Sequence, residues 1–233
     1  MLNNLFSAEV LQETLSIVQG QFLLAFWETL YVTIAAMFFA VVIGLPLGVI
    51  LVVGEKSGLA PLPGWLMKTI NVIINLLRSV PFLILLFPFT RAVVGTAVGT
   101  VASIVPLVVA AFPFVARLVE SSLRELNPNI IEMSRSMGAS PMQTIIKVMI
   151  PEAMPSLISN ATIAITTILG YTAMSGIVGG GGLGKIAINY GYYRYKYLVM
   201  LLAVILLIVI VQVFQSIGTH LSVKLDKRLK QNH

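Results

Sequence analysis

The sequence predicts an all-α integral membrane protein with five transmembrane helices. Of its 233 residues, 58% are hydrophobic and only 10% are charged, and the mean hydropathy is +0.95. A soluble domain carries about 25% charged residues, so this chain has too few to cover a water-exposed surface. Five apolar stretches are also long enough to cross a bilayer, which takes about 20 residues.

The five predicted spans divide the chain in order. They lie at about residues 22–53, 65–89, 93–119, 156–178 and 197–221. Residues 1–21 have apolar positions near helical spacing but are too polar to cross, which predicts an amphipathic segment at the extracytoplasmic interface. Residues 222–233 form a basic tail. Gly44, Pro46 and Gly48 predict a kink or a close helix approach in the first span.

The distribution of Lys and Arg predicts the orientation of the chain. If the tail is cytoplasmic, ten Lys and Arg residues fall inside and four outside, with Arg78 left within the second span. Cytoplasmic loops carry such an excess in membrane proteins. Five crossings then place the N-terminus outside, the C-terminus in the cytoplasm, and the loop 120–155 in the cytoplasm.

A polar stretch, residues 127–155, predicts two short helices that meet at a corner. Asn127 can cap the first helix, and Pro128 suits its first turn because the N–H that proline lacks would be unpaired there. Gly138 suits the left-handed residue that ends this helix.

The second helix of the corner is predicted to begin with Ser140 as its cap and Pro141 in its first turn. Pro151 and Pro155 are expected to limit how far it runs. The corner also keeps apolar residues: Ile130, Ile131, Met133, Met137, Ile145, Val148 and Met149. A polar corner with an apolar side suggests a docking element, but a solvated loop between spans fits the spacing equally well.

The run from Gly179 to Lys185 imitates a phosphate-binding loop, because four residues separate its first glycine from Gly184-Lys185. Ile186 stands where such a loop has the Ser or Thr that binds magnesium, and no strand precedes it. We therefore predict an outer turn or a close-packed hinge between the last two spans, and no ATP hydrolysis by this chain itself.

Two charged residues fall at predicted spans. Arg78 would cost about 2.5–3.5 kcal/mol at the centre of a bilayer. It is expected to face the bundle, water or a carbonyl freed by Pro81. Two roles fit such a position: contact with a solute or gate, or a structural role. Glu28 fits either a proton or cation site or a plain interfacial residue. Its place beside Trp27 favours the interfacial residue.

Small and polar residues occupy the centre of the fourth span. Tyr171, Thr172, Met174 and Ser175, together with Arg78, are candidates for lining or gating a solute pathway, although helix packing explains the pattern equally well.

Catalytic and metal-binding residues are not predicted. The chain has no cysteine, and His220 and His233 lack further ligands nearby. It contains no Ser/His/Asp set and no pair of intramembrane carboxylates.

The polar corner resembles the EAA loop of ABC importer permeases. That motif reads Glu-Ala-Ala, three residues, Gly, nine residues, Ile-x-Leu-Pro. Here Glu132, Gly138 and Pro151 occupy its Glu, Gly and Pro positions. Four motif positions are changed to small or apolar residues, which packing should tolerate: Met133, Ser134, Val148 and Ile150.

The similarity to this family extends over nearly the whole chain after residue 26, and it is greatest to methionine importer permeases. The segments that carry this similarity are residues 27–30, 78–82, 88–91, 170–174 and 179–184.

The resemblance implies a type I ABC importer fold of five spans. The permease domain would cover residues 22–221, with a core at about 26–219, and would lie in the bacterial cytoplasmic (inner) membrane as a multi-pass protein. In this family the loop is a coupling helix that docks in a cleft of a separate ATPase. Its residues here are Asn127, Pro128, Glu132, Arg135, Gly138, Ala139, Ser140, Pro141 and Pro151.

The resemblance also implies the partners. They are a second copy of the chain, two ATP-binding cassette subunits, an extracytoplasmic solute-binding (lipo)protein and the lipid bilayer, without nucleic acid. This chain would hold no cofactor, since ATP and Mg²⁺ bind the partner ATPase.

The function that we predict is import of L- or D-methionine by alternating access. The alternatives are a permease for another small solute, an ion-coupled secondary carrier and a non-transporting scaffold. The carrier should have an intramembrane ionisable pair and often an inverted repeat, and no repeat is visible. The scaffold would not need the polar residues of the fourth span.

Overall fold

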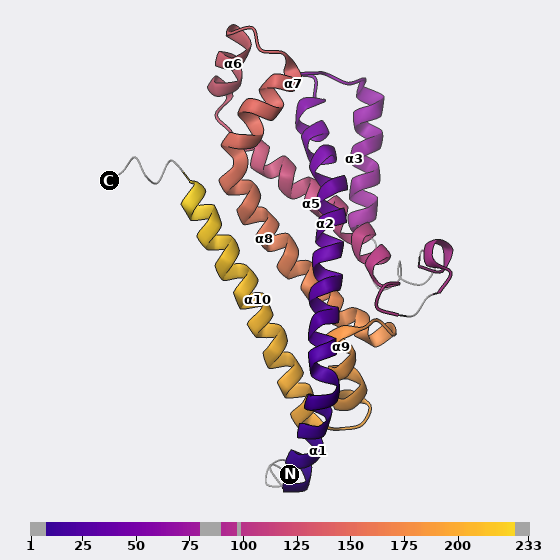
Figure 1. Cartoon of the computed structure of the whole chain (residues 1–233). Coiled ribbons are helices and arrows are strands. Elements are labelled where there is room, and N and C mark those ends of the chain that lie inside the picture. The colour runs from indigo at the N-terminus through magenta and orange to yellow at the C-terminus, as the bar shows by residue number, and fades with distance from the viewer. Residues whose placement is uncertain (1–7, 80–89, 97–98, 227–233) are drawn as a thin grey trace. The chain divides into compact units, whose positions relative to one another are not determined.

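The computed structural model describes residues 8–79, 90–96 and 99–226, and the regular structure in this part of the chain is helical (Figure 1). Its α-helices are α1 Ala8–Ile17, α2 Leu23–Val53, α3 Gly64–Ser79, α5 Ile104–Arg124, α6 Pro128–Ser136, α7 Pro141–Thr144, α8 Ile150–Ser175, α9 Gly182–Ile186 and α10 Tyr197–Leu225. π-Helical turns join α1 to α2 at Val18–Phe22, join α7 to α8 at Ile145–Met149, and extend α9 at Ala187–Tyr192. The predicted all-α class is confirmed.

The chain is a multi-pass membrane protein. Within the described ranges, four stretches are long and apolar enough to span: Val10–Val53, Ile104–Arg124, Pro141–Ser175 and Tyr197–Leu225. The sequence predicted five. The difference lies in the second predicted span, because α3 has only 16 residues and residues 80–89 lie outside the described part. At the N-terminus, α1 passes through a π-helical turn into α2, so the helix has no break at residue 21.

One predicted span limit and one predicted helix limit are wrong. The third span does not begin at residue 93, because Gly95 and Gly99 take left-handed φ values of +80° and +129° and α5 starts only at Ile104. Pro151 and Pro155 do not end the helix that starts at α7, which continues to Ser175. The π-helical turn before Pro151, in which the Ile150 N–H donates to the Ile145 carbonyl, adjusts the backbone where proline cannot form an α-helical bond.

The chain divides into two compact units. The first comprises Met1–Met37, Pro81–Val108 and Ile165–Val213. Among its described residues, Ile168, Leu183 and Val199 are fully buried in its core.

The second unit comprises Phe38–Val80, Val109–Ala164 and Phe214–His233. Its core cluster is formed by Leu51, Met67, Ile74 and Ala116, against which Leu47, Leu62 and Ile70 pack.

The glycines of α2 explain how closely α2 and α5 approach in the second unit. A Cβ on Gly44 would lie 2.8 Å from Val115 Cγ1, and one on Gly48 would lie 2.6 Å from Val119 Cβ. Such separations leave no room for any side chain, so the close approach predicted from Gly44 and Gly48 is confirmed.

Candidate functional site

The corner formed by α6 and α7 is built from local capping interactions (Figure 1). Asn127 Oδ1 accepts the Asn129 N–H at 3.0 Å, and Pro128 is the first residue of α6. Gly138 has a φ of +79°, and its N–H donates to the Arg135 carbonyl at 2.9 Å. The predicted cap and the predicted left-handed glycine are both confirmed.

The second helix of the corner begins with a capping box. Ser140 Oγ accepts the Gln143 N–H at 3.3 Å, and Gln143 Oε1 accepts the Ser140 N–H at 2.9 Å. The hydroxyls of Ser134 and Thr144, both buried, lie 3.0 Å apart and join α6 to α7. The corner therefore has a shape set by its own hydrogen bonds.

The outer side of the corner is apolar. Met133, Met137 and Met142 are 64%, 84% and 64% exposed. A groove of about 540 Å³ lies beside them, lined by Ile130, Met133, Ser134, Met137, Gly138, Ala139, Gln143, Lys147 and Val148. Glu132, Arg135 and Pro151 are exposed. Flexible methionines on a defined backbone suit a surface that packs against a partner protein.

Two of the predicted pathway residues take part in hydrogen bonds within the first unit. Thr172 Oγ1 donates to the Ile168 carbonyl at 2.9 Å and lies 3.5 Å from Thr33 Oγ1. Ser175 Oγ donates to the Thr172 carbonyl at 2.7 Å, and both side chains are buried.

The remaining pathway candidates are more accessible. Tyr171 is half-buried, Met174 is 47% exposed, and Arg78 is exposed in the last turn of α3. Their roles stay predictions.

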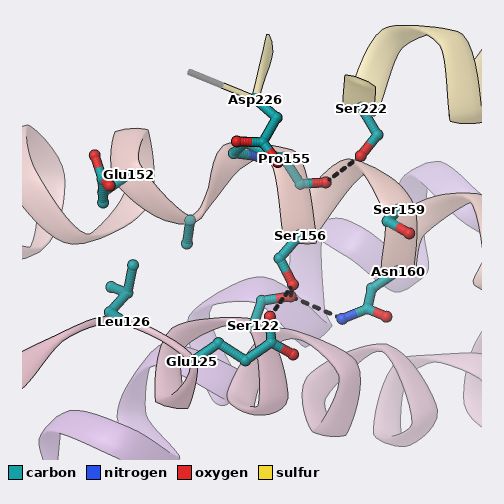
Figure 2. Close-up of a pocket in the computed structure, with 11 residues that line it drawn as sticks. Ser122, Glu125, Leu126, Glu152, Pro155, Ser156, Ser159, Asn160, Ser222 and Asp226 are labelled. Atoms are coloured by element: carbon teal, nitrogen blue, oxygen red, sulfur yellow. Dashed lines mark hydrogen bonds between the residues drawn. The ribbon is translucent and has the colours of Figure 1, made fainter. Parts of the chain in front are cut away.

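Polar residues at the start of α8 bond to α5 and α10 in the second unit, as Figure 2 shows. Asn160 Nδ2 donates to Ser122 Oγ at 2.8 Å, and Ser156 Oγ donates to the Glu125 carboxylate at 2.7 Å. Ser222 of α10 donates to the Pro155 carbonyl at 2.8 Å. These residues line a polar pocket of about 380 Å³. They show that part of the polar character of α8 serves helix packing.

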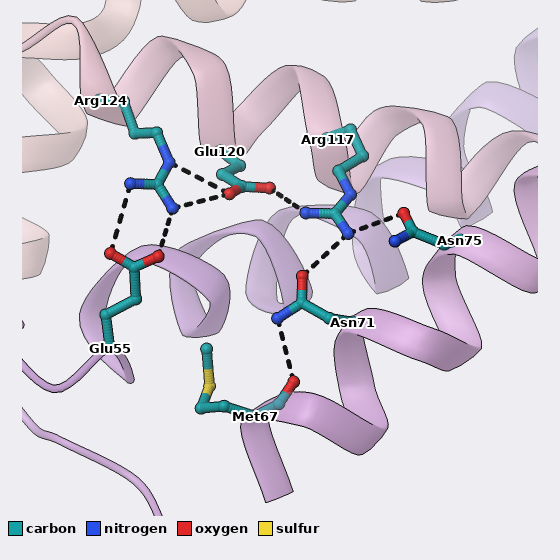
Figure 3. Close-up of polar contacts among 7 residues, drawn as sticks. All are labelled: Glu55, Met67, Asn71, Asn75, Arg117, Glu120 and Arg124. Carbon is teal, nitrogen blue, oxygen red and sulfur yellow. Dashed lines mark hydrogen bonds and ion pairs between the residues drawn. The ribbon is translucent and has the colours of Figure 1, made fainter. Parts of the chain in front are cut away.

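A second polar network, which the sequence interpretation missed, joins α3 to α5 (Figure 3). Arg117 donates to Asn71 Oδ1 and Asn75 Oδ1, each at 2.9 Å, and to Glu120 at 2.6 Å. Glu120 also accepts from Arg124, at 2.9 Å. The signal was present, because each helix repeats its polar residues at spacings of three or four.

The glycine run does not form a phosphate cradle. The Gly180 N–H donates to the Ser175 carbonyl at 2.9 Å, the Gly182 N–H to Glu28 Oε2 at 2.7 Å, and the Leu183 N–H to Thr29 Oγ1 at 2.9 Å. These backbone donors are used inside the protein. Glu28 therefore binds the backbone of the glycine run, a contact that the interfacial role favoured by the sequence does not include. Within the described residues, no group of three or more His, Cys, Asp or Glu is arranged to hold a metal ion.

Comparison with known proteins identifies the class of membrane protein to which this chain belongs. Residues 44–227 match the family described as binding-protein-dependent transport system inner membrane component. The chain is 47% identical over 210 residues to the probable D-methionine transport system permease protein MetI of Vibrio cholerae serotype O1, covering 88% of this chain and 92% of that one. It is 50% identical over 153 residues to the D-methionine transport system permease protein MetI of Escherichia coli K12, covering 64% of this chain and 70% of that one.

Solved structures agree with these matches. A structure described as inward facing conformations of the MetNI methionine ABC transporter has a TM-score of 0.87 at 44% identity, covering 90% of this chain and 98% of that one. An amino acid ABC transporter with histidines, 20% identical with a TM-score of 0.69, shares the fold.

The fold and these matches define an all-helical membrane permease with the type I ABC importer fold. The chain belongs to the family of binding-protein-dependent transport system inner membrane components, and it is a multi-pass protein of the inner membrane.

Proposed function

We propose that this chain is the permease subunit of an ATP-driven importer of methionine, working with a separate ATPase. The single observation that carries the coupling role is the capped corner at residues 127–151, with exposed methionines beside a groove. The names of the MetI relatives and of the MetNI structure support methionine as the substrate. L- and D-methionine are both included, and another small solute is the alternative.

The mechanism that we propose is alternating access. ATP closes the ATPase pair, whose cleft holds the α6–α7 corner and moves it. Because the corner is held by its capping box and by the Ser134–Thr144 hydrogen bond, this movement reaches α8 through the unbroken helix Pro141–Ser175. The spans then open outward, the binding protein releases its solute, and hydrolysis of ATP reverses the motion.

The assembly that we propose contains two copies of this chain, two ATP-binding cassette subunits and an extracytoplasmic binding protein. Each chain would cross the membrane five times, with its N-terminus outside. The apolar surface of α10 supports contact with lipid or a second copy, since Leu201, Ile208 and Val209 are each more than half exposed.

An ion-coupled carrier is less well supported. Such a carrier needs an intramembrane ionisable pair. Glu28 accepts hydrogen bonds from Gly182 and Thr100, which are uncharged, and this arrangement favours a structural role for its carboxylate.

The test is uptake of labelled methionine by proteoliposomes that contain this chain, its ATPase and its binding protein. We expect ATP-dependent uptake that is lost in Glu132→Lys and Gly138→Pro, although both variants insert. Lys185→Ala, an exposed change in the glycine run, is the control and should keep uptake and ATPase activity.

Each result decides a separate point. Normal uptake by both corner variants would refute the docking role. If the chain stimulates ATPase activity but methionine is not taken up, the importer proposal stands and methionine is excluded as its substrate. Loss of ATPase activity in Lys185→Ala would revive the phosphate-loop interpretation.

A further inference from the structure

Glu28 of α2 holds two distant segments of the first unit. Its Oε2 accepts the Gly182 N–H at 2.7 Å, and its Oε1 accepts the Thr100 hydroxyl at 3.0 Å. The next residue, Thr29, accepts the Leu183 N–H at 2.9 Å. Two consecutive side chains of one helix thus bind the backbone of the glycine run.

The glycines of this run are required for that contact. Gly182 has a φ of +83°, and a Cβ on it would lie 2.5 Å from Thr29 Oγ1. A Cβ on Gly181 would lie 2.6 Å from Glu28 Oε2. The run therefore lacks side chains where its backbone meets α2. Close packing explains these glycines, and binding of a phosphate is not needed to explain them.

The same run is tied to the end of α8. The Gly180 N–H donates to the Ser175 carbonyl at 2.9 Å, and the Gly99 N–H donates to the Gly179 carbonyl at 3.0 Å. A Cβ on Gly176 would overlap the Gly184 backbone. Because the run stays bonded to Ser175, a shift of the run away from Glu28 would also shift the end of α8, which carries the predicted pathway residues Tyr171 and Met174.

We propose that Glu28 is a positioning residue, which acts as a hydrogen-bond acceptor to hold the glycine run and the end of α8 in place for solute passage. This inference rests on the proposed importer function. It assigns Glu28 the role of acceptor to two uncharged donors, the Gly182 N–H and the Thr100 hydroxyl.

Comparison of Glu28→Gln with Glu28→Ala tests this directly. The glutamine carbonyl can accept the Gly182 N–H while its NH₂ donates to Thr100 Oγ1, so the amide can replace both bonds of the carboxylate. We expect Glu28→Gln to transport within about twofold of the parent, and Glu28→Ala to lose about tenfold because the Gly182 N–H and the Thr100 hydroxyl lose their partner. Equal loss in both variants would show that transport needs more from Glu28 than these two hydrogen bonds and would overturn the proposal, as would full activity of Glu28→Ala.

A second measurement does not depend on transport. The chain has no cysteine, and Leu183 is 0% exposed, so Leu183→Cys reports whether the run opens. Maleimide should label this cysteine about tenfold faster when Glu28→Ala is added, because local opening exposes a buried thiol. With Glu28→Gln the rate should stay that of Leu183→Cys alone. An unchanged rate with Glu28→Ala would overturn the proposed hold.

A matched pair of glycine variants completes the test. Gly182→Ala should lose transport, since its Cβ meets Thr29, whereas Gly20→Ala should not, since its Cβ meets nothing within 4 Å. Equal transport by the two variants would overturn the proposed contact. If the parent shows no ATP-driven uptake, the proposed importer function fails, while the labelling of Leu183→Cys still decides whether Glu28 holds the run.

Discussion

At the scale of single residues, Gly138 illustrates a backbone requirement without a packing requirement. Its φ is +79°, yet an added Cβ would meet nothing within 4 Å. Glycine is therefore needed at the end of α6 for its conformation alone. Gly182 differs, because a positive φ and a close neighbour both exclude a side chain there.

We predict that Gly138→Ala destabilises the protein by about 1–2 kcal/mol, the cost of a left-handed L-residue, and that Gly138→Asn costs less. Thermal unfolding of the purified protein measures both. Gly64→Ala is the control, because Gly64 has open space and no positive φ. A midpoint for Gly138→Ala equal to that of Gly64→Ala would contradict the backbone argument.

At the scale of elements, the polar network on α5 contains an inner ion pair within the helix and an outer one to the loop that follows α2. The inner pair, Arg117 with Glu120, has side chains 20% and 13% exposed. The outer pair, Arg124 with Glu55, has side chains 45% and 41% exposed. Solvent screens the outer pair more strongly, so the inner pair should contribute more to stability. The bonds that join α5 to α3 come from Arg117 to Asn71 and Asn75.

We predict that Arg117→Ala costs about 1.5–3 kcal/mol, because it leaves Glu120 and two asparagines without their shared donor. Arg124→Ala should cost about 1 kcal/mol or less, as exposed pairs do. Thermal unfolding of the two variants side by side measures this. Equal destabilisation would show that burial does not govern the network.

The helix from Pro141 to Ser175 shows how an element can override its local signals. Pro151 lacks the N–H for an α-helical bond, and the sequence alone therefore predicts a break. The π-helical turn Ile145–Met149 precedes it, and the helix continues. For the proposed mechanism this continuity matters, because one helix then connects the corner to the predicted pathway residues.

At the scale of the whole molecule, orientation decides which side meets which partner. The charge distribution predicts that the corner is cytoplasmic and that the tyrosine-rich segment before α10 is outside. Met137 and Tyr193 represent the two sides, and they are 84% and 61% exposed.

The absence of cysteine makes this orientation directly measurable. In intact spheroplasts, an impermeant maleimide should label Tyr193→Cys at once and Met137→Cys only after permeabilisation, because the bilayer excludes charged reagents. Tags on the two termini should likewise be accessible from opposite sides if the chain crosses five times. Labelling of both cysteines from outside would reverse the proposed orientation, and termini on one side would contradict the odd number of spans.

Features that depend on neighbours in the sequence could be predicted without the structure. The membrane class follows from composition, and the last span begins at Tyr197 as expected. The caps at Asn127 and Ser140 were predictable because each joins residues only two or three positions apart. These bonds form wherever the local backbone allows them.

Features that depend on distant partners needed the tertiary structure. Glu28 and Gly182 are 154 positions apart, and Arg117 and Asn71 are 46 apart, so no local pattern pairs them. The start of α5 at Ile104 likewise follows a long-range bond, from the Gly99 N–H to the Gly179 carbonyl. The physical reason is the same in each case: packing and hydrogen bonds between distant segments outweigh the weaker local preference of the chain.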